Sequence, residues 1–300
     1  MSSLFILVVY IFIGFILQHS KLPVQNLHLK LNKFLINIAI PAVILLETPK
    51  LHLSMDNLIP MYIAWATMAT SAFFVYFLSK RYHFSRNITG SLMLVTVLPN
   101  STLVGIPMIS AYFGAESLPF IVLYDQLGTS LWLAVYATII VAFYTNKGVV
   151  SPLGITLKIL RFPPLIAFVF AMTYGSLNEF SFLITILEII TLGLVPAALI
   201  SVGLQLKFKI ATDEIKPFVI SVLIKLIFAP ALAILICYSF GWLDLLIAKV
   251  SIMEAGMASM ITAGVIASIN GLAPRLSNAI VAYSISFSFF TSWILYILIR

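Results

Sequence analysis

Charged residues and cysteines are scarce in this 300-residue sequence. Only 9% of the residues are Asp, Glu, Lys or Arg, whereas about 25% is usual in a soluble domain. The single cysteine, Cys237, has no partner for an intrachain disulfide, and it excludes a metal site built from several cysteines. The four histidines fall in connectors or at the edges of apolar segments, where they indicate neither a metal cluster nor a nucleophilic triad. They are His19, His28, His52 and His83.

Apolar residues, in contrast, make up 62% of the chain, and the mean hydropathy is +1.12. They come in long runs separated by short polar connectors, and a helix that spans a bilayer needs about 20 predominantly apolar residues. The first run, Leu4 to Leu17, has no preceding Lys or Arg and no small-x-small cleavage site, so we expect a retained helix rather than a signal peptide. We therefore predict an all-α polytopic membrane protein. Its ten transmembrane helices are expected at residues 3–18, 31–47, 57–79, 87–113, 118–144, 156–175, 181–206, 217–240, 244–269 and 276–299.

The basic residues are distributed unevenly between the connectors. Most of them lie in odd-numbered connectors, and only Lys50 and Arg300 fall on the opposite side. Because basic connectors are retained in the cytoplasm, this asymmetry predicts a multi-pass protein of the cell membrane with both termini extracellular. The net charge of +7 is then a topology signal, and we expect the lipid bilayer rather than nucleic acid as the partner. The residues concerned are Lys21, Lys30, Lys33, Lys80, Arg81, Arg86, Lys147, Lys158, Arg161, Lys207, Lys209, Lys216 and Arg275.

The two halves of the chain resemble one another weakly. Pro41-Ala42 aligns with Pro196-Ala197, although the identity between the halves is thin. With five spans in each half, an odd number, two similar halves must insert with opposite orientation, as in many transporters. The predicted organisation is a first five-helix repeat over residues 1–146 and an inverted second repeat over residues 147–300, which together form one transmembrane domain.

The fourth predicted span carries a concentration of helix-breaking and polar residues. It contains Pro99, Asn100, Ser101, Gly105 and Pro107 near its middle. Proline removes a backbone donor and clashes with the preceding turn, so the helix should be interrupted here. In hydrocarbon, the freed backbone groups are tolerated only inside protein or along a watery cavity. The alternative is an ordinary proline kink whose polar residues bond back to their own helix.

The ninth predicted span has a matching disturbance in the second half of the chain, at Glu254-Ala255-Gly256-Met257. A carboxylate at this depth costs about 2.5 to 3.5 kcal/mol when ionised, so it should face a cavity, hold a partner or be protonated. Interrupted helices in corresponding positions of two halves indicate a transport site. Each break also starts a half-helix whose free N–H groups and positive dipole end suit an anion.

Several short motifs occur in an order and spacing that carry a family resemblance. They are Leu31-Asn32-Lys33, Ile40-Pro41-Ala42, Pro99-Asn100-Ser101, Gly105-Ile106-Pro107, Tyr124-Asp125, Pro196-Ala197, Gly203-Leu204 and Glu254-Ala255. In these motifs, and essentially from end to end, the sequence resembles the auxin efflux carrier (AEC) family of permeases, which includes bacterial organic-acid carriers. The resemblance implies ten helices in two inverted repeats, crossing unwound segments in spans 4 and 9, and an elevator-like movement against a scaffold. The family usually has a proline where this sequence has Ala258, so the second break is expected to rest on Gly256.

These observations together predict a secondary transporter that moves a small organic anion, a mono- or dicarboxylate. No catalytic or metal-binding residue is predicted and no cofactor, although Glu254 or Asp125 would exchange a proton or Na⁺. Asp125 has the alternative role of a hydrogen-bond partner for a helix end. A homodimer through the scaffold is a further expectation. The predicted substrate-binding residues are Pro99, Asn100, Ser101, Gly105, Ala255, Gly256 and Met257.

Other functions remain open at this stage. A carrier related to the sodium-coupled bile-acid symporters would have a similar ten-helix plan, and a channel or sensor is a third option. A membrane enzyme is disfavoured because the apolar spans lack the paired Asp, Ser-Lys or His arrangements that catalysis requires. Among the remaining charges, Glu47 is expected to be solvated, and Glu188 is expected to pair with Lys225 if that lysine does not extend to the membrane surface.

Overall fold

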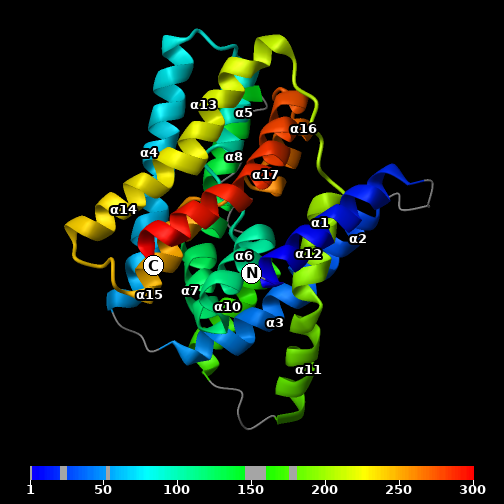
Figure 1. Ribbon diagram of the computed structural model, residues 1–300, viewed down its shortest axis with the longest axis vertical. Helices are drawn as coiled ribbons and strands as arrows, with labels where there is room; N and C mark the ends of the chain where they lie inside the picture. Colours follow the sequence, from blue (N-terminus) through cyan, green and yellow to red (C-terminus); the bar gives the residue numbers. More distant parts are fainter. Residues whose placement is uncertain (1, 21–25, 52–54, 146–159, 176–180) are drawn as a thin grey trace.

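The fold is all-helical in the part of the chain that the computed structural model describes, residues 2–20, 26–51, 55–145, 160–175 and 181–300 (Figure 1). Six helices are long and apolar enough to cross a membrane: Leu27–Lys50, Ile59–Arg81, Ala115–Thr145, Ser181–Gly203, Thr212–Ser239 and Pro274–Ile299. Shorter apolar helices cover Phe5–His19, Ser101–Phe113 and Pro163–Tyr174. The chain is thus a multi-pass membrane protein, and ten spans in two inverted repeats stay a prediction. Some predictions concern positions outside the described residues, namely Lys21, His52, Lys147, Lys158 and the repeat boundary at 146/147.

One set of helices packs around α12 and is called here the scaffold group. Within it, α1 runs along α12, α2 also contacts α12, and α3 lies against α10 and α11. Figure 1 shows this group in the lower right of the view, with α11 extending furthest from the rest. Its members are α1 (Ser2–His19), α2 (Leu27–Phe34), α3 (Ile40–Glu47), α10 (Pro163–Tyr174), α11 (Ser181–Leu192) and α12 (Leu194–Gly203).

A second set, called the bundle group, occupies the upper part of Figure 1. In it α15 packs against α4 and α14, while α16 packs against α5 and α17. The group consists of α4 (Ile59–Arg81), α5 (Arg86–Val95), α8 (Leu131–Thr145), α13 (Ile215–Leu223), α14 (Ala229–Ser239), α15 (Leu246–Ala255), α16 (Ile261–Ile269) and α17 (Pro274–Ile299). Between the groups, α6 (Ile106–Phe113) contacts α1, and α7 (Leu118–Leu123) contacts α3. Short 3₁₀ turns are η2 (Thr48–Lys50), η3 (Met55–Leu58), η5 (Ala115–Ser117) and η7 (Thr212–Glu214).

Prolines inside the long helices are accommodated by wider, π-helical turns. Three of these turns end just before a helix whose second residue is proline, at Pro41, Pro107 and Pro230. Proline has no N–H and its ring clashes with the carbonyl four residues earlier, and a wider turn relieves that clash. The helix after Ser101 therefore continues through Pro107 without a break. The π-helical turns are η1 (Leu35–Ala39), η4 (Ser101–Gly105), η6 (Tyr124–Ser130) and η8 (Ile224–Phe228).

Two expectations about charged residues are wrong. Glu47 is buried rather than solvated, and the 3₁₀ turn that follows its helix places Lys50 Nζ 2.7 Å from its Oε1. Glu188 does not pair with Lys225, since Glu188 lies exposed on α11 of the scaffold group and Lys225 is buried in η8 of the bundle. Sequence spacing could not reveal that these two residues belong to different groups of helices.

Candidate functional site

Two helices are interrupted deep in the protein. The first interruption separates α5, which ends at Val95, from η4, which begins at Ser101. The second separates α15, which ends at Ala255, from α16, which begins at Ile261. Residues 96–100 and 256–260 are not helical. The alternative of a simple proline kink in the fourth span is thereby excluded.

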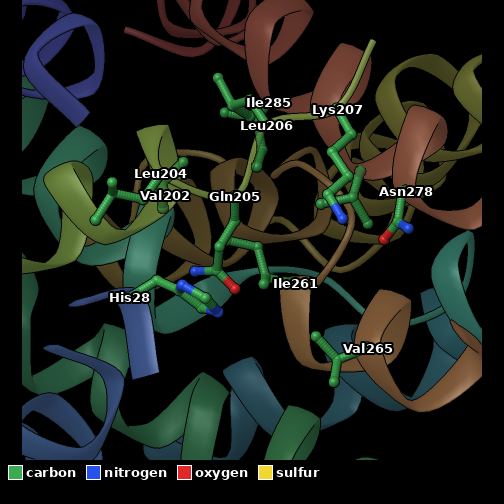
Figure 2. A pocket seen from close by; sticks show the side chains of 11 residues that line it. His28, Val202, Leu204, Gln205, Leu206, Lys207, Ile261, Val265, Asn278 and Ile285 are labelled. Carbon is green, nitrogen blue, oxygen red and sulfur yellow. The ribbon is translucent and has the colours of Figure 1, made fainter. Parts of the chain in front are cut away.

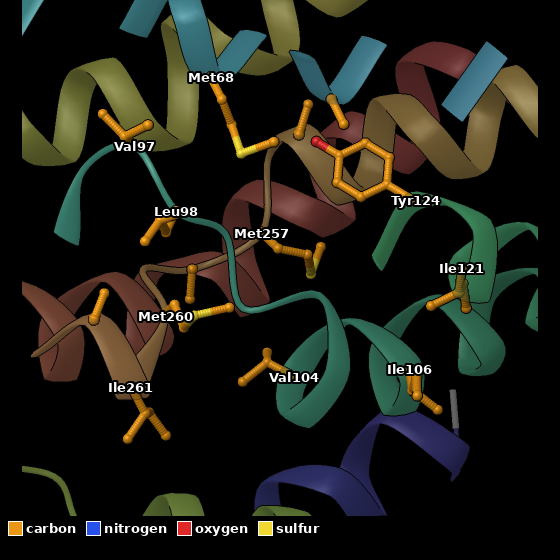
Figure 3. Close-up of a cluster of buried hydrophobic side chains, with 14 of the residues drawn as sticks. Met68, Val97, Leu98, Val104, Ile106, Ile121, Tyr124, Met257, Met260 and Ile261 are labelled. Carbon is orange, nitrogen blue, oxygen red and sulfur yellow. The ribbon is translucent and has the colours of Figure 1, made fainter. Parts of the chain in front are cut away.

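The two interruptions cross and pair with each other. The Asn100 amide donates to the Ala258 carbonyl at 2.8 Å, and the Met260 amide donates to the Leu98 carbonyl at 2.9 Å. Pro99 and Ser259 form the antiparallel bridge at the centre. Figure 3 shows the two extended segments, with the side chains of Leu98 and Met260 that belong to them. Each break thus supplies hydrogen-bond partners to the other, which satisfies backbone groups that hydrocarbon cannot.

The second break begins at Gly256, where an added Cβ would lie 3.1 Å from Leu295 Cδ2 and 3.2 Å from Pro230 Cβ, and its dependence on this glycine stays a prediction. Gly256 has φ −85° and ψ 1°, a conformation that other residues adopt as well. The pairing with Leu98 and Asn100 supports the break, and the Ser259 amide also donates to Ser284 Oγ of α17 at 3.0 Å.

Asp125 is held at the beginning of the helix that follows the first break. Its Oδ1 accepts hydrogen bonds from the hydroxyls of Ser101 at 2.5 Å and Thr102 at 2.9 Å. Its Oδ2 accepts from Gln126 at 2.7 Å and Ser130 at 3.3 Å. This arrangement is the one expected of a partner for a helix end. Whether Asp125 also exchanges an ion stays a prediction.

Glu254 is in a different situation, because it is fully buried and neither carboxylate oxygen has a hydrogen-bond partner among the described residues. The carboxylate packs on Gly105, where an added Cβ would lie 2.6 Å from Oε1 and 2.9 Å from Oε2. Lys225 and Asp125 are near enough to interact with it electrostatically, although no ion pair within 4.0 Å joins Glu254 to Lys225. The glycine therefore creates the space in which this carboxylate lies.

Several buried polar atoms around the crossing have no partner among the described residues. They include Asn100 Nδ2, Ser259 Oγ and Gln126 Oε1. A buried polar group left without a hydrogen bond costs about 1 to 3 kcal/mol. Their concentration beside the breaks leaves donors and acceptors available to a bound molecule.

The structure brings the predicted site residues together from both halves of the chain. All of them are buried at or directly beside the crossing. They are Pro99, Asn100, Ser101, Gly105, Ala255, Gly256 and Met257, with Glu254 and Asp125 adjacent. Their role as ligands of a substrate stays a prediction. Sequence reasoning did not assign Ser259, Ser284 or Gln126 to the site, although Ser259 and Gln126 lie beside residues that it singled out. Only the polar character of Ser284 within an apolar span could have indicated that residue.

Comparisons with known proteins agree with a membrane transporter. The sequence model of the family described as "Membrane transport protein" (Mem_trans) matches residues 1–148 and again residues 149–296. A relative named "Uncharacterized transporter" comes from Methanothermobacter thermautotrophicus. It is 26% identical over 267 residues, which cover 88% of this chain and 86% of the relative.

Proposed function

The chain belongs to the membrane transport protein family, that of the auxin efflux carriers, and on this premise we propose that it is a secondary carrier for a small organic anion. The observation that carries the proposal is the crossing of the two broken helices, where the side-chain Nδ2 of Asn100 and the hydroxyl of Ser259 are buried with no partner among the described residues. In transporters built on broken helices, substrate sites lie where half-helices meet. A carboxylate is the chemistry that such N–H groups and dipole ends favour.

The two groups of helices support an elevator-like mechanism. The second break lies between two helices of the bundle group, the first begins at the end of the bundle helix α5, and the crossing hydrogen bonds join the two breaks into one unit. Contacts to the scaffold group include those of α6 with α1, of η4 with α12 and of α7 with α3. We infer that the bundle carries the site past the scaffold, so that the substrate meets each side of the membrane in turn.

Glu254 is the favoured residue for coupling to an ion. An ionised carboxylate near the site would repel an anionic substrate, and a proton or Na⁺ on Glu254 would remove that repulsion. Its oxygens lack partners among the described residues, whereas all four hydrogen bonds of Asp125 are made within the protein. This difference supports Glu254 as the titrating group and Asp125 as a structural one.

The test is Asn100→Ala in purified protein, with binding of small carboxylic acids followed by calorimetry. The substitution removes the side-chain amide, whose Nδ2 has no partner among the described residues, and retains the Asn100 backbone N–H that pairs with Ala258. We expect affinity for the acid that binds wild-type protein to fall about tenfold or more, because a hydrogen bond to a charged group contributes about 1.5 to 3 kcal/mol.

Asn270→Ala is the matched control, since Asn270 lies outside the crossing at the end of α16. It should bind the acid with wild-type affinity. If Asn100→Ala is monodisperse and binds as tightly as wild-type protein, Asn100 does not contact the substrate and the proposed site is wrong.

A further inference from the structure

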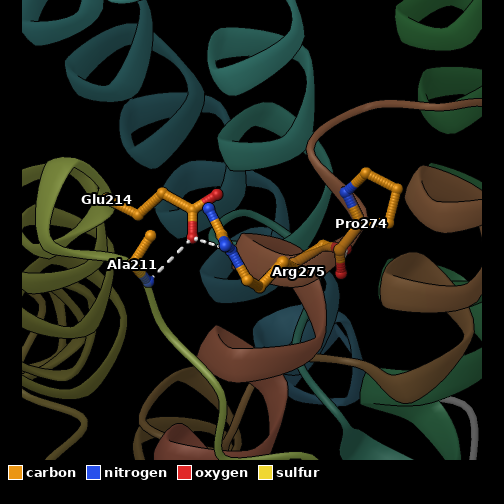
Figure 4. Close-up of polar contacts among 5 residues, drawn as sticks. Ala211, Glu214, Pro274 and Arg275 are labelled. Carbon is orange, nitrogen blue, oxygen red and sulfur yellow. Dashed lines mark hydrogen bonds and ion pairs between the residues drawn. The ribbon is translucent and has the colours of Figure 1, made fainter.

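The connector at residues 204–211 runs from α12 of the scaffold group to η7, the turn before α13 of the bundle group, and is called here the strap. Its first turn continues the hydrogen bonding of α12, to which the Gln205 amide donates at 2.9 Å. At its other end, the Ala211 amide donates to Glu214 Oε2 at 3.2 Å, and Arg275 Nε of α17 donates to the same oxygen at 2.9 Å (Figure 4). The two ends of the strap are therefore fixed to different groups of helices.

Two cavities border the strap in the gap between the groups. The inner one, of about 150 Å³, is lined by His28 of the scaffold group, by Ile261 at the start of α16 and Asn278 of α17, and by Lys207 of the strap. Figure 2 shows Lys207 and Asn278 on one side of this space and His28 on the other. The outer cavity, of about 620 Å³, shares Lys207 and Asn278 with the inner one. Along the strap, open space therefore separates the two groups.

Phe208, in the middle of the strap, bridges this gap. Its ring lies edge-to-face with Phe15 of α1, with the ring centroids 6.0 Å apart, and with Tyr283 of α17, with the centroids 5.1 Å apart. The Tyr283 hydroxyl also donates to the Phe208 carbonyl oxygen at 3.3 Å. The N–H groups of residues 207–210 make no backbone hydrogen bond to a described residue, so the aromatic contacts hold the middle of the strap. Phe208 thus links a scaffold helix to a bundle helix.

This link depends on how the two groups are placed relative to each other. Phe15 belongs to the scaffold group and Tyr283 to the bundle group, and the carbonyl of Phe208 is bound to Tyr283. Dispersion between packed atoms weakens strongly once a gap of about 1 Å opens. A bundle that slides past the scaffold therefore carries Phe208 away from Phe15 and breaks that contact.

We propose that Phe208 is a latch for the transport cycle: between Phe15 and Tyr283, it stabilises the arrangement of the two groups in which the cavities open beside the strap, and it is released when the bundle moves. In the predicted orientation this is the arrangement open to the cytoplasm. The inference rests on the proposed carrier function and adds to it a residue that sets the balance between two access states.

The experiment measures the distance between two spin labels, one on each group, by pulsed electron paramagnetic resonance on the purified full-length protein. The labels are attached to cysteines that replace two exposed residues away from the strap, Ile166 of α10 and Leu235 of α14, in a Cys237→Ala background. Two access states give two distances, and the ratio of their populations reports the balance without any ligand.

We expect Phe208→Ala to lower the population of the present state relative to the other state about threefold or more, because the aromatic pair with Phe15 is lost from one state alone. Phe15→Leu should shift the ratio in the same direction. The double variant should shift it little further than Phe208→Ala does, since both substitutions remove one contact.

Phe218→Ala is the matched control. Phe218 of α13 also lies edge-to-face with Tyr283, at 5.2 Å between ring centroids, but both residues belong to the bundle group. The substitution therefore removes an aromatic pair of the same kind that both states retain, and the ratio should stay at its wild-type value.

The outcomes separate this inference from the proposed function. An unchanged ratio in Phe208→Ala, or an equal shift in Phe218→Ala, overturns the latch, because the ring of Phe208 would then favour neither state. Independent effects of Phe15→Leu and Phe208→Ala in the double variant overturn it as well. A single distance in both wild type and Phe208→Ala refutes the latch together with the elevator-like movement, but it leaves a carrier with local gating standing. The proposed function fails on another measurement, if wild-type protein binds no small carboxylic acid in calorimetry.

Discussion

The contact between Gly105 and Glu254 allows a direct test of the packing at the crossing. In Gly105→Ala, the new Cβ would lie 2.6 Å from Glu254 Oε1, 2.9 Å from Oε2 and 3.1 Å from Cδ. Cβ atoms do not approach other heavy atoms within 3.0 Å, so the carboxylate must move. Glu254 is fully buried, and the crossing closes the space around it. Overpacking of this kind costs about 1 to 3 kcal/mol.

The expected result is a lower melting temperature. For a chain of this length, a loss of about 2 kcal/mol corresponds to a decrease of roughly 4 to 6 °C. Cys237 provides the assay, because it is the single cysteine and is buried, so a thiol-reactive dye reports unfolding. Glu254→Asp shortens the side chain by one methylene, and in the double variant it should recover part of the loss. That recovery measures the coupling between the two positions.

Gly193→Ala serves as the control for the glycine substitution itself. The nearest described atom to its added Cβ is the Ile190 carbonyl oxygen at 3.5 Å, an ordinary contact, and its φ is −78°. This variant should melt within about 1 °C of wild type or slightly above it. If Gly105→Ala melts at the wild-type temperature, or if Glu254→Asp rescues nothing, the carboxylate does not lie against Gly105 and the proposed site geometry is wrong.

Three further predictions concern coupling, topology and movement. Glu254→Gln should flatten the pH dependence of transport in reconstituted vesicles, because a neutral isostere removes the titrating group; an unchanged profile would exclude Glu254 as the coupling residue. Single cysteines placed near Lys80 or Lys209 in a Cys237→Ala background should resist impermeant thiol reagents in intact cells, and labelling from outside would reverse the predicted orientation. A disulfide introduced between η4 and α12, which pack together, should stop transport, and its reduction should restore transport. Full transport activity with the cross-link formed would argue against the elevator-like movement and for local gating.

Much of the candidate site could be predicted from short-range chemistry. Pro99 and the polar residues after it indicated an interruption, because proline cannot continue a helix and polar groups are costly in hydrocarbon. The burial of Glu254 followed from its place in an apolar span. The role of Pro107 did not follow, since the widened turn before it absorbs the clash that the sequence suggested would break the helix.

Other features depended on partners far away in the chain. Gly256 was expected to support the second break, and the structure adds the hydrogen bonds that Ala258 and Met260 make to the first break. The sequence could not show that Asp125 and Glu254 differ in their hydrogen bonding, because both are carboxylates in apolar segments. Only their neighbours show that one accepts four hydrogen bonds and that the other accepts none from the described residues.

Composition, apolar runs and proline placement therefore determined, from the sequence alone, that this is a helical membrane protein with interrupted helices, and the motifs in it indicated the family. These signals are local, since transfer into a bilayer and the loss of a backbone donor act residue by residue. Only the tertiary structure decided that the interruptions pair with each other, that Gly105 makes room for Glu254, and that Lys207 shares a cavity with the start of α16. Such contacts join residues from opposite halves of the chain, and their pairing depends on how whole helices pack.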